Sequence, residues 1–237
     1  MNRKGIKEKF AKLFDDPNRV TFKDSLNNIT GEYEDLEFKE NEIEPQILAK
    51  HILGIANTLG GIICLGIEET DNGLKPKGLE KNSDVTPMKQ KLGNYLPPNL
   101  KYDIHPIDYD KNEEWKELRN KSFKIITIEY TPEYLPFMPI KSCDLYEKTD
   151  IFCRKHSNTE RCEYEDLQKI LNKRIKTLQN QFNLEKELKE LELLMSYEIP
   201  QKQIYYTLYN RNFLNKISEF REKKEKIIEK GLKIDEC

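Results

Sequence analysis

The sequence predicts an α+β protein, α/β in its best-defined part, in which a mixed β-sheet with packed helices is followed by a helical C-terminal extension. Three observations lead to this prediction. Residues 33–67 have the pattern of a strand, a helix and a second strand; short strand patterns follow as far as residue 155; and beyond Arg161 the apolar residues recur at helical spacing. We therefore expect an N-terminal helical arm at 1–30, a sheet domain at 31–162 and a helical extension at 163–237 that serves oligomerisation or docking.

The N-terminal arm begins with a short amphipathic pattern. Apolar residues lie at helical spacing among lysines in residues 3–14, at Ile6, Phe10, Leu13 and Phe14. The pattern stops before Asp15-Asp16-Pro17, and the polar stretch that follows carries Asn27 and Asn28. We predict one amphipathic helix here.

The strand–helix–strand unit comes next. Residues 33–39 alternate, with Leu36 and Phe38 on one face and charged residues on the other, which predicts a half-buried strand. Apolar residues at helical spacing predict a helix over 43–57, which Gly60-Gly61 ends. The uninterrupted apolar run at 62–67 is typical of a buried central strand, with Glu68 and Glu69 at its edge.

The rest of the chain is described more coarsely. We predict a helix over 85–95, strands over 102–107, 123–130 and 151–155, and a proline-rich loop between the last two strands. After Arg161 a helical stripe continues to Met195, and Pro200 suits the first turn of another helix. The later part of this stripe is a candidate pairing surface.

Composition limits the classes of function. Lys and Arg number 40 and Asp and Glu 42, so a nucleic-acid site would have to be a local basic patch. The sequence has no run of eighteen apolar residues and no charged-then-apolar leader, so we expect no membrane span and no signal peptide. The five cysteines are scattered, which favours reduced thiols in a cytoplasmic protein.

Three blocks together resemble the Schlafen AlbA-like domain family. They are EYEDLEFK at 32–39, IANTLGG at 55–61 with LGIEE at 65–69, and IFCRKHSNT at 151–159. In nucleases of this family two glutamates five residues apart, a lysine and a later acid form the active site. The resemblance therefore implies that Glu32, Glu37 and Glu69 hold a metal ion and that Lys39 assists catalysis.

Chemistry supports this interpretation. Glu37 and Lys39 project from the same strand face, and carboxylates held together favour a cation such as Mg²⁺ or Mn²⁺ between them. Such an ion activates water and stabilises charge on a phosphate. The later acid is usually aspartate in the family and is glutamate here, and Glu68 is an alternative to Glu69. The competing interpretation is a surface ion pair between Glu37 and Lys39, in a non-catalytic nucleic-acid-binding or regulatory module.

Other cofactor sites are disfavoured. ATP is disfavoured although such domains are often labelled ATP-binding, because Gly60-Gly61 lacks the phosphate-loop pattern and follows its helix instead of preceding it. Zinc is disfavoured because Cys143, Cys153, His156 and Cys162 match no standard spacing. His51 and His105 are expected to be structural.

The expected partners are a nucleic acid and a second copy of the chain. A basic stripe of five residues is a candidate phosphate-binding surface, or alternatively a solvated helix face: Arg154, Lys155, Arg161, Lys173 and Arg174. RNA, such as tRNA or another structured RNA, is favoured over DNA by the resemblance alone. The family's nucleases enclose their substrate between two related lobes, so this single lobe is expected to form a homodimer. The resemblance also suggests antiviral defence, with a possible protein partner in a defence complex.

Overall fold

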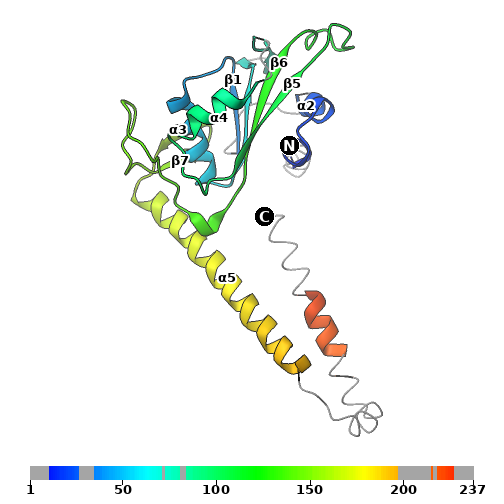
Figure 1. Cartoon of the computed structure of the whole chain (residues 1–237), viewed down its shortest axis with the longest axis vertical. Coiled ribbons are helices and arrows are strands. Elements are labelled where there is room, and N and C mark those ends of the chain that lie inside the picture. Colours follow the sequence, from blue (N-terminus) through cyan, green and yellow to red (C-terminus); the bar gives the residue numbers. More distant parts are fainter. Residues whose placement is uncertain are drawn as a thin grey trace. The chain divides into compact units, whose positions relative to one another are not determined.

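The computed structural model describes residues 11–26, 35–70, 73–80, 84–196, 215 and 218–226. The chain divides into two units, Met1–Ile175 and Lys176–Cys237, and the first contains the sheet (Figure 1). Glu32 and the helix predicted from Pro200 lie outside the described residues, as does most of the helix predicted at 3–14. Within that last stretch, residues 11–15 are helical.

A four-stranded mixed sheet forms the centre of the first unit. Its strands are β1 (Leu36–Lys39), β2 (Gly61–Leu65), β6 (Ser122–Ile128) and β5 (Tyr102–Asp108), in that order across the sheet. β1 and β2 are parallel and are joined by helix α3 (Pro45–Ala56), whereas β6 is antiparallel to both of its neighbours. The predicted mixed sheet with packed helices is thus confirmed.

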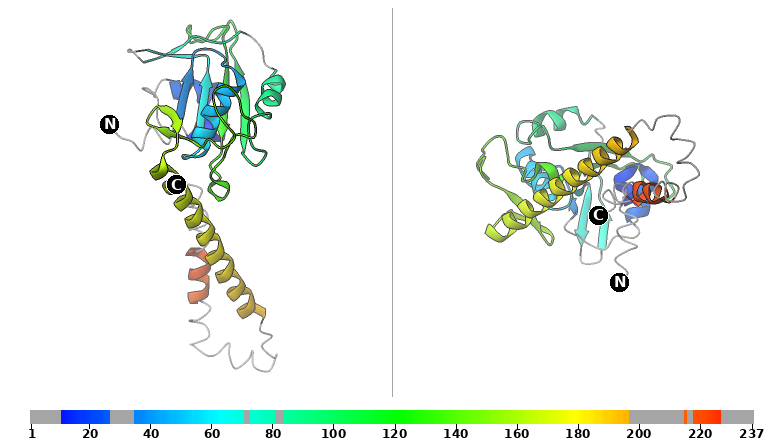
Figure 2. Two further views of the ribbon diagram at one scale, coloured as in Figure 1. Left: turned by 90° about the vertical axis from the view of Figure 1, so that its left-hand side faces the viewer. Right: turned by 90° about the horizontal axis from the view of Figure 1, so that it is seen from below.

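Both faces of the sheet are covered. On one face α3 and α4 (Thr86–Leu92) pack over the inward side chains of β2 and β6, including Ile63, Leu65 and Ile126. On the other face α2 (Arg19–Leu26) packs through Phe22 and Leu26. Figures 1 and 2 show the sheet between these two helical layers. The sequence analysis predicts no helix over residues 19–26, although Phe22 and Leu26 lie at helical spacing.

Two hairpins flank the sheet. The first is β3 (Ile67–Thr70) with β4 (Gly73–Pro76), and the second is β7 (Phe152–Lys155) with β8 (Asn158–Arg161). The apolar run predicted as one strand at 62–67 is interrupted at Gly66, whose φ is +100°. Glu68 and Glu69 therefore lie within β3 and do not end a strand. The loop before β7 contains a short 3₁₀ turn, η1 (Pro132–Tyr134).

The turn between α3 and β2 needs its two glycines. Gly60 and Gly61 have φ values of +71° and +150°. A Cβ on Gly61 would lie 2.1 Å from the backbone oxygen of Asp35, which no side chain can tolerate. This pair is therefore a tight connection that lets β2 pair with β1.

The C-terminal extension begins with a long helix, as predicted. Helix α5 (Tyr164–Ser196) spans 33 residues and is anchored at its start by the buried Ile170. Among the described residues, no helix is both long and apolar enough to cross a membrane.

Candidate functional site

The centre of the candidate site is the carboxylate of Glu37. Strand alternation on β1 directs Glu37 and Lys39 to the same side, where α3 covers the sheet. Glu37 is only 2% exposed. The prediction of a half-buried strand is therefore wrong for this face, because α3 and the β7–β8 hairpin cover the carboxylate.

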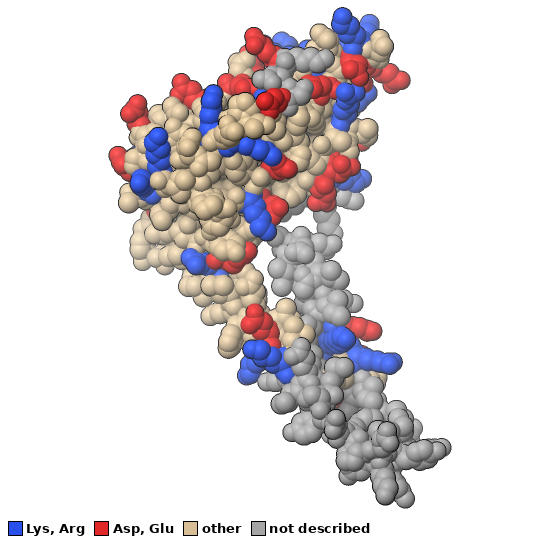
Figure 3. Space-filling model, in the orientation of Figure 1, with Lys and Arg blue, Asp and Glu red and all other residues tan. Residues whose placement is uncertain are grey.

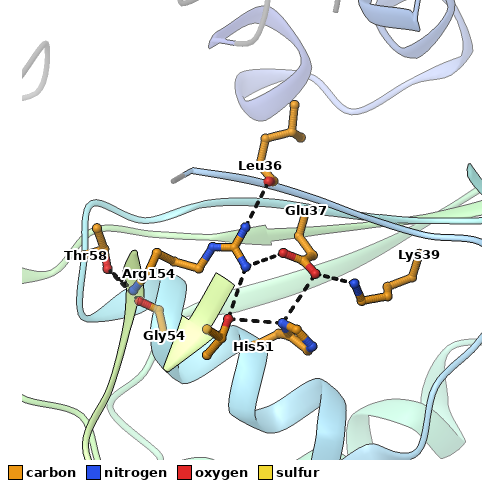
Figure 4. A network of polar contacts seen from close by, with 8 residues as sticks. Leu36, Glu37, Lys39, His51, Gly54, Thr58 and Arg154 are labelled. Atoms are coloured by element: carbon orange, nitrogen blue, oxygen red, sulfur yellow. Dashed lines mark hydrogen bonds and ion pairs between the residues drawn. The ribbon is translucent and has the colours of Figure 1, made fainter. Parts of the chain in front are cut away.

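Three side chains surround this carboxylate. The guanidinium of Arg154 on β7 pairs with Oε2, and the Arg154 side chain has no exposed surface. The ammonium of Lys39 pairs with Oε1, and Nδ1 of His51 on α3 lies 3.5 Å from the same oxygen. Figure 4 shows these groups converging on Glu37 from β1 itself, from α3 and from the distant strand β7.

A second set of contacts holds Arg154 in place. Its NH1 group donates to Thr159 Oγ1 at 3.1 Å and its NH2 group to the backbone oxygen of Leu36 at 3.4 Å. The same Thr159 oxygen lies 3.1 Å from Nδ1 of His51. The Arg154 backbone N–H donates to Thr58 Oγ1 at 2.9 Å, and this hydroxyl donates to the backbone oxygen of Gly54 at 2.8 Å. The hairpin is thus fastened to the end of α3.

This fastening requires a close approach of the hairpin to the helix. A Cβ on Gly54 would lie 2.6 Å from the Thr159 methyl group, so only glycine leaves room for the hairpin here. Asn57 strengthens the connection, because its side-chain amide donates to the backbone oxygens of Phe137 and Phe152, both at 2.9 Å. Its side-chain oxygen accepts from the backbone N–H of Phe137 at 2.7 Å. Asn57 thus bridges two distant segments.

The charge of the network follows from its members. Burial is the main cause that lowers the pKa of His51 to about 4, so the imidazole is neutral at pH 7. Arg154 and Lys39 then contribute two positive charges against the one negative charge of Glu37. The Lys39 side chain is 29% exposed and that of Arg154 is fully buried, so Lys39 is the cation of the pair with access to the surface.

The remaining predicted metal ligands are placed differently. Glu32 lies outside the described residues. Glu69 is exposed on β3, opposite Leu74 in the hairpin. In the part of the chain that the structure describes, no group of three or more His, Cys, Asp and Glu side chains is arranged to hold a metal ion. The four residues considered and disfavoured above as zinc ligands, Cys143, Cys153, His156 and Cys162, are all among the described residues and form no such group.

The predicted basic stripe is divided between the interior and the surface. Arg154 is interior. Lys155 faces three carboxylates, with Asp166 at 3.0 Å, and Arg161 pairs with Asp150 at 3.0 Å. Lys173 and Arg174 donate to the backbone oxygens of Thr58 and Leu135, at 2.8 and 2.9 Å. On the visible face of the first unit, basic and acidic side chains are interspersed (Figure 3).

Comparison with known proteins assigns the chain to a family. The model of the family described as Schlafen, AlbA_2 matches residues 32–163. The chain belongs to the Schlafen AlbA_2 family. This match confirms the resemblance and includes every element of the Glu37 network. No curated protein matches the chain.

One solved structure similar to this AlbA_2 chain is the DIP2311 protein from Corynebacterium diphtheriae. The two chains are 13% identical, with a TM-score of 0.42. The similar region covers 70% of this chain and 28% of that protein, so this chain spans less than a third of its length.

Sequence reasoning missed two members of the AlbA_2 network. Arg154 is predicted on a surface stripe and lies in the interior, and His51, which is expected to be structural, is part of the network. Once a helix covers the face of the strand that carries Glu37, the carboxylate needs a buried cation beside it. Alternation on 151–155 places Arg154 on the opposite face from Lys155, which was reason to separate these two residues.

Proposed function

We propose that this AlbA_2 domain binds nucleic acid, with RNA as the favoured partner, and that Glu37 belongs to its framework and does not hold a catalytic metal ion. The observation that carries this proposal is the burial of Glu37 against the fully buried Arg154. A carboxylate so placed already has its charge balanced within the fold.

A divalent ion at Glu37 would have to compete with cations of the chain itself. Lys39 and Arg154 contact different oxygens of the carboxylate. Displacing Arg154 would leave a guanidinium in the interior without its carboxylate, which costs several kcal/mol. A metal ion at Oε2 would therefore require rearrangement of the core, whereas a metal ion at Oε1 would have to displace Lys39.

The surplus positive charge supports the binding role. Lys39 ends the network at the surface, and an ammonium in that position suits a phosphate oxygen. Basic and acidic side chains are interspersed on the visible face, so a broad positive surface does not account for nucleic-acid binding there. We therefore expect a small binding site that contacts few phosphates.

A second candidate function is a divalent-metal-dependent nuclease. The observation in its favour is the direct pairing of Glu37 with Lys39 at the end of β1. These are the carboxylate and the lysine that the family resemblance assigns to the active site. Glu32 and Glu69 would complete the site, with Mg²⁺ or Mn²⁺ as the ion. A role in antiviral defence, with a partner protein, would accompany either function.

One experiment separates the two functions. The purified chain is incubated with end-labelled tRNA and with single-stranded DNA, in Mn²⁺ or in EDTA, while anisotropy reports binding and a denaturing gel reports cleavage. We expect RNA binding that EDTA does not abolish and intact RNA in every lane. Lys39→Ala should weaken binding about tenfold or less, as expected for the loss of one phosphate contact.

The choice of variants makes the result decisive. Because Glu37 is buried, a Glu37 variant can lose activity by unfolding, so the exposed Glu69→Gln is the informative acid variant. Lys101→Ala is the matched control for Lys39→Ala, since Lys101 is exposed and pairs with Glu129. Cleavage that needs Mn²⁺ and fails in Glu69→Gln would replace the first proposal by the second. Absence of binding to either nucleic acid would overturn both.

A further inference from the structure

Two cysteines that are separate in the sequence meet on the β7–β8 hairpin. Cys153 on β7 lies opposite Glu160 on β8, and the next position on that face, just beyond β8, is Cys162. The ladder continues to this point, because the Cys162 backbone N–H donates to the backbone oxygen of Ile151 at 2.7 Å. Cys153 and Cys162 are therefore diagonal neighbours on one face of a two-stranded ribbon.

The two thiols interact directly with each other. A hydrogen bond between them is the main cause that lowers the pKa of Cys153 and raises the pKa of Cys162. Burial, Asp166 and Glu160 oppose the shift at Cys153, whereas the nearby ammonium of Lys155 adds to it. Cys162 thus serves as the donor that stabilises a thiolate at Cys153.

The surroundings of this pair leave one side open. Cys153 is 6% exposed and borders the main core, whereas Cys162 is half-buried at the edge of the same core. Cys64 is a contrast, because it is fully buried in the sheet and burial raises the pKa of its thiol well above the usual range. The Cys153–Cys162 pair therefore combines thiolate character, a second thiol within reach and access for a small molecule, which are the features of a peroxide-sensitive site.

We propose that Cys153 and Cys162 are a site of reversible oxidation, at which hydrogen peroxide joins them in a disulfide across the hairpin. The Cys153 sulfur attacks one peroxide oxygen, the O–O bond breaks, and a sulfenic acid and one water are formed. The Cys162 sulfur then attacks the Cys153 sulfur, so the S–O bond breaks, the S–S bond forms and a second water leaves. The two thiols supply the two electrons and two protons that convert the peroxide to water, and a small thiol reverses the oxidation.

The disulfide would fix the hairpin at a position that matters for the Glu37 network. Cys153 directly precedes Arg154, and Cys162 lies two residues before α5 begins. Closing this short loop removes conformations from the unfolded chain, so oxidation should stabilise the fold and hold the strand that presents Arg154 to Glu37. The proposal does not depend on what the AlbA_2 domain binds.

Peptide mapping of the full chain tests the site. The reduced chain is treated with hydrogen peroxide, its remaining thiols are blocked with N-ethylmaleimide, and it is digested with trypsin without reduction. Cleavage after Arg154 and Arg161 places the two cysteines on separate peptides. We expect mass spectrometry to find these two peptides linked, with the loss of two hydrogen atoms, and dithiothreitol to separate them.

Two serine variants and an unfolding measurement complete the test. In Cys162→Ser the reaction should stop at a sulfenic acid on Cys153, which dimedone traps, whereas Cys143→Ser is the matched control and should form the same disulfide as the unmodified chain. The oxidised chain should unfold in urea at a midpoint about 1 M above that of the reduced chain.

Three results would overturn the proposal. The first is a chain in which Cys143 or Cys237 is oxidised while Cys153 and Cys162 still react with N-ethylmaleimide. The second is a disulfide from either residue of the pair to a third cysteine in place of the expected one. The third is oxidation of both thiols to acids with no bond between them.

Discussion

The two consecutive residues Arg154 and Lys155 illustrate two uses of positive charge in this fold. Arg154 points inward, has no exposed side-chain surface and balances Glu37. Lys155 points outward and faces acids at the start of α5. Both are cations on the same strand, and only the direction imposed by strand alternation differs. The inner cation should therefore determine stability, whereas the outer one should adjust the surface charge.

The largest expected effect follows from removing the inner cation. Arg154→Met leaves Glu37 buried with only Lys39 and the neutral His51 beside it. Removing one member of a buried pair costs about 3–5 kcal/mol, and Lys39 should keep the loss near the lower figure. Urea denaturation of the two proteins at pH 7.5 measures the difference in the free energy of unfolding.

Two further variants sharpen this test. Arg161→Met removes an exposed arginine from the neighbouring strand and should change stability by less than about 1 kcal/mol. The double variant Glu37→Met with Arg154→Met should lose less than the sum of the two single changes, because no charge is left without its counterpart. Equal effects at Arg154 and Arg161 would show that burial does not separate these two residues.

The second effect concerns the pH dependence of the inner network. The pKa of His51 falls from 6.5 to about 4 on folding, so the unfolded chain binds a proton more readily. The stability that this residue contributes is complete above pH 6.5 and is lost as the pH falls toward 4. Between pH 7.5 and pH 5 the loss is about 2 kcal/mol.

The comparison with a neutral variant isolates this contribution. His51→Asn cannot titrate in this range, so its free energy of unfolding should fall less steeply with pH than that of the unmodified chain. Chemical denaturation at pH 7.5 and pH 5 gives both slopes. Identical slopes would mean that His51 does not titrate as its burial requires.

The difference between inner and outer charges also separates what the sequence could predict from what it could not. The mixed sheet and the helix over 43–57 follow from periodicity, and the pairing of Glu37 with Lys39 follows from alternation. The burial of Glu37 could not be predicted from residues 33–39, because it depends on α3 and on a hairpin more than a hundred residues away. Likewise, the need for glycine at position 54 becomes clear only from its close contact with Thr159, which the sequence does not reveal.

The smallest expected effect is at the outer cation. Lys155 lies between Asp166, Glu163 and Glu160, and hydrogen bonding to Asp166 is the main cause that raises its pKa. Salt screens such surface pairs, so Lys155→Gln should lower the melting temperature by about 2 °C or less at low salt and by still less at high salt. Thermal denaturation at two salt concentrations measures this. A loss as large as that of Arg154→Met, unchanged by salt, would mean that the outer cation is also part of the framework, and the division between inner and outer charges would then be wrong.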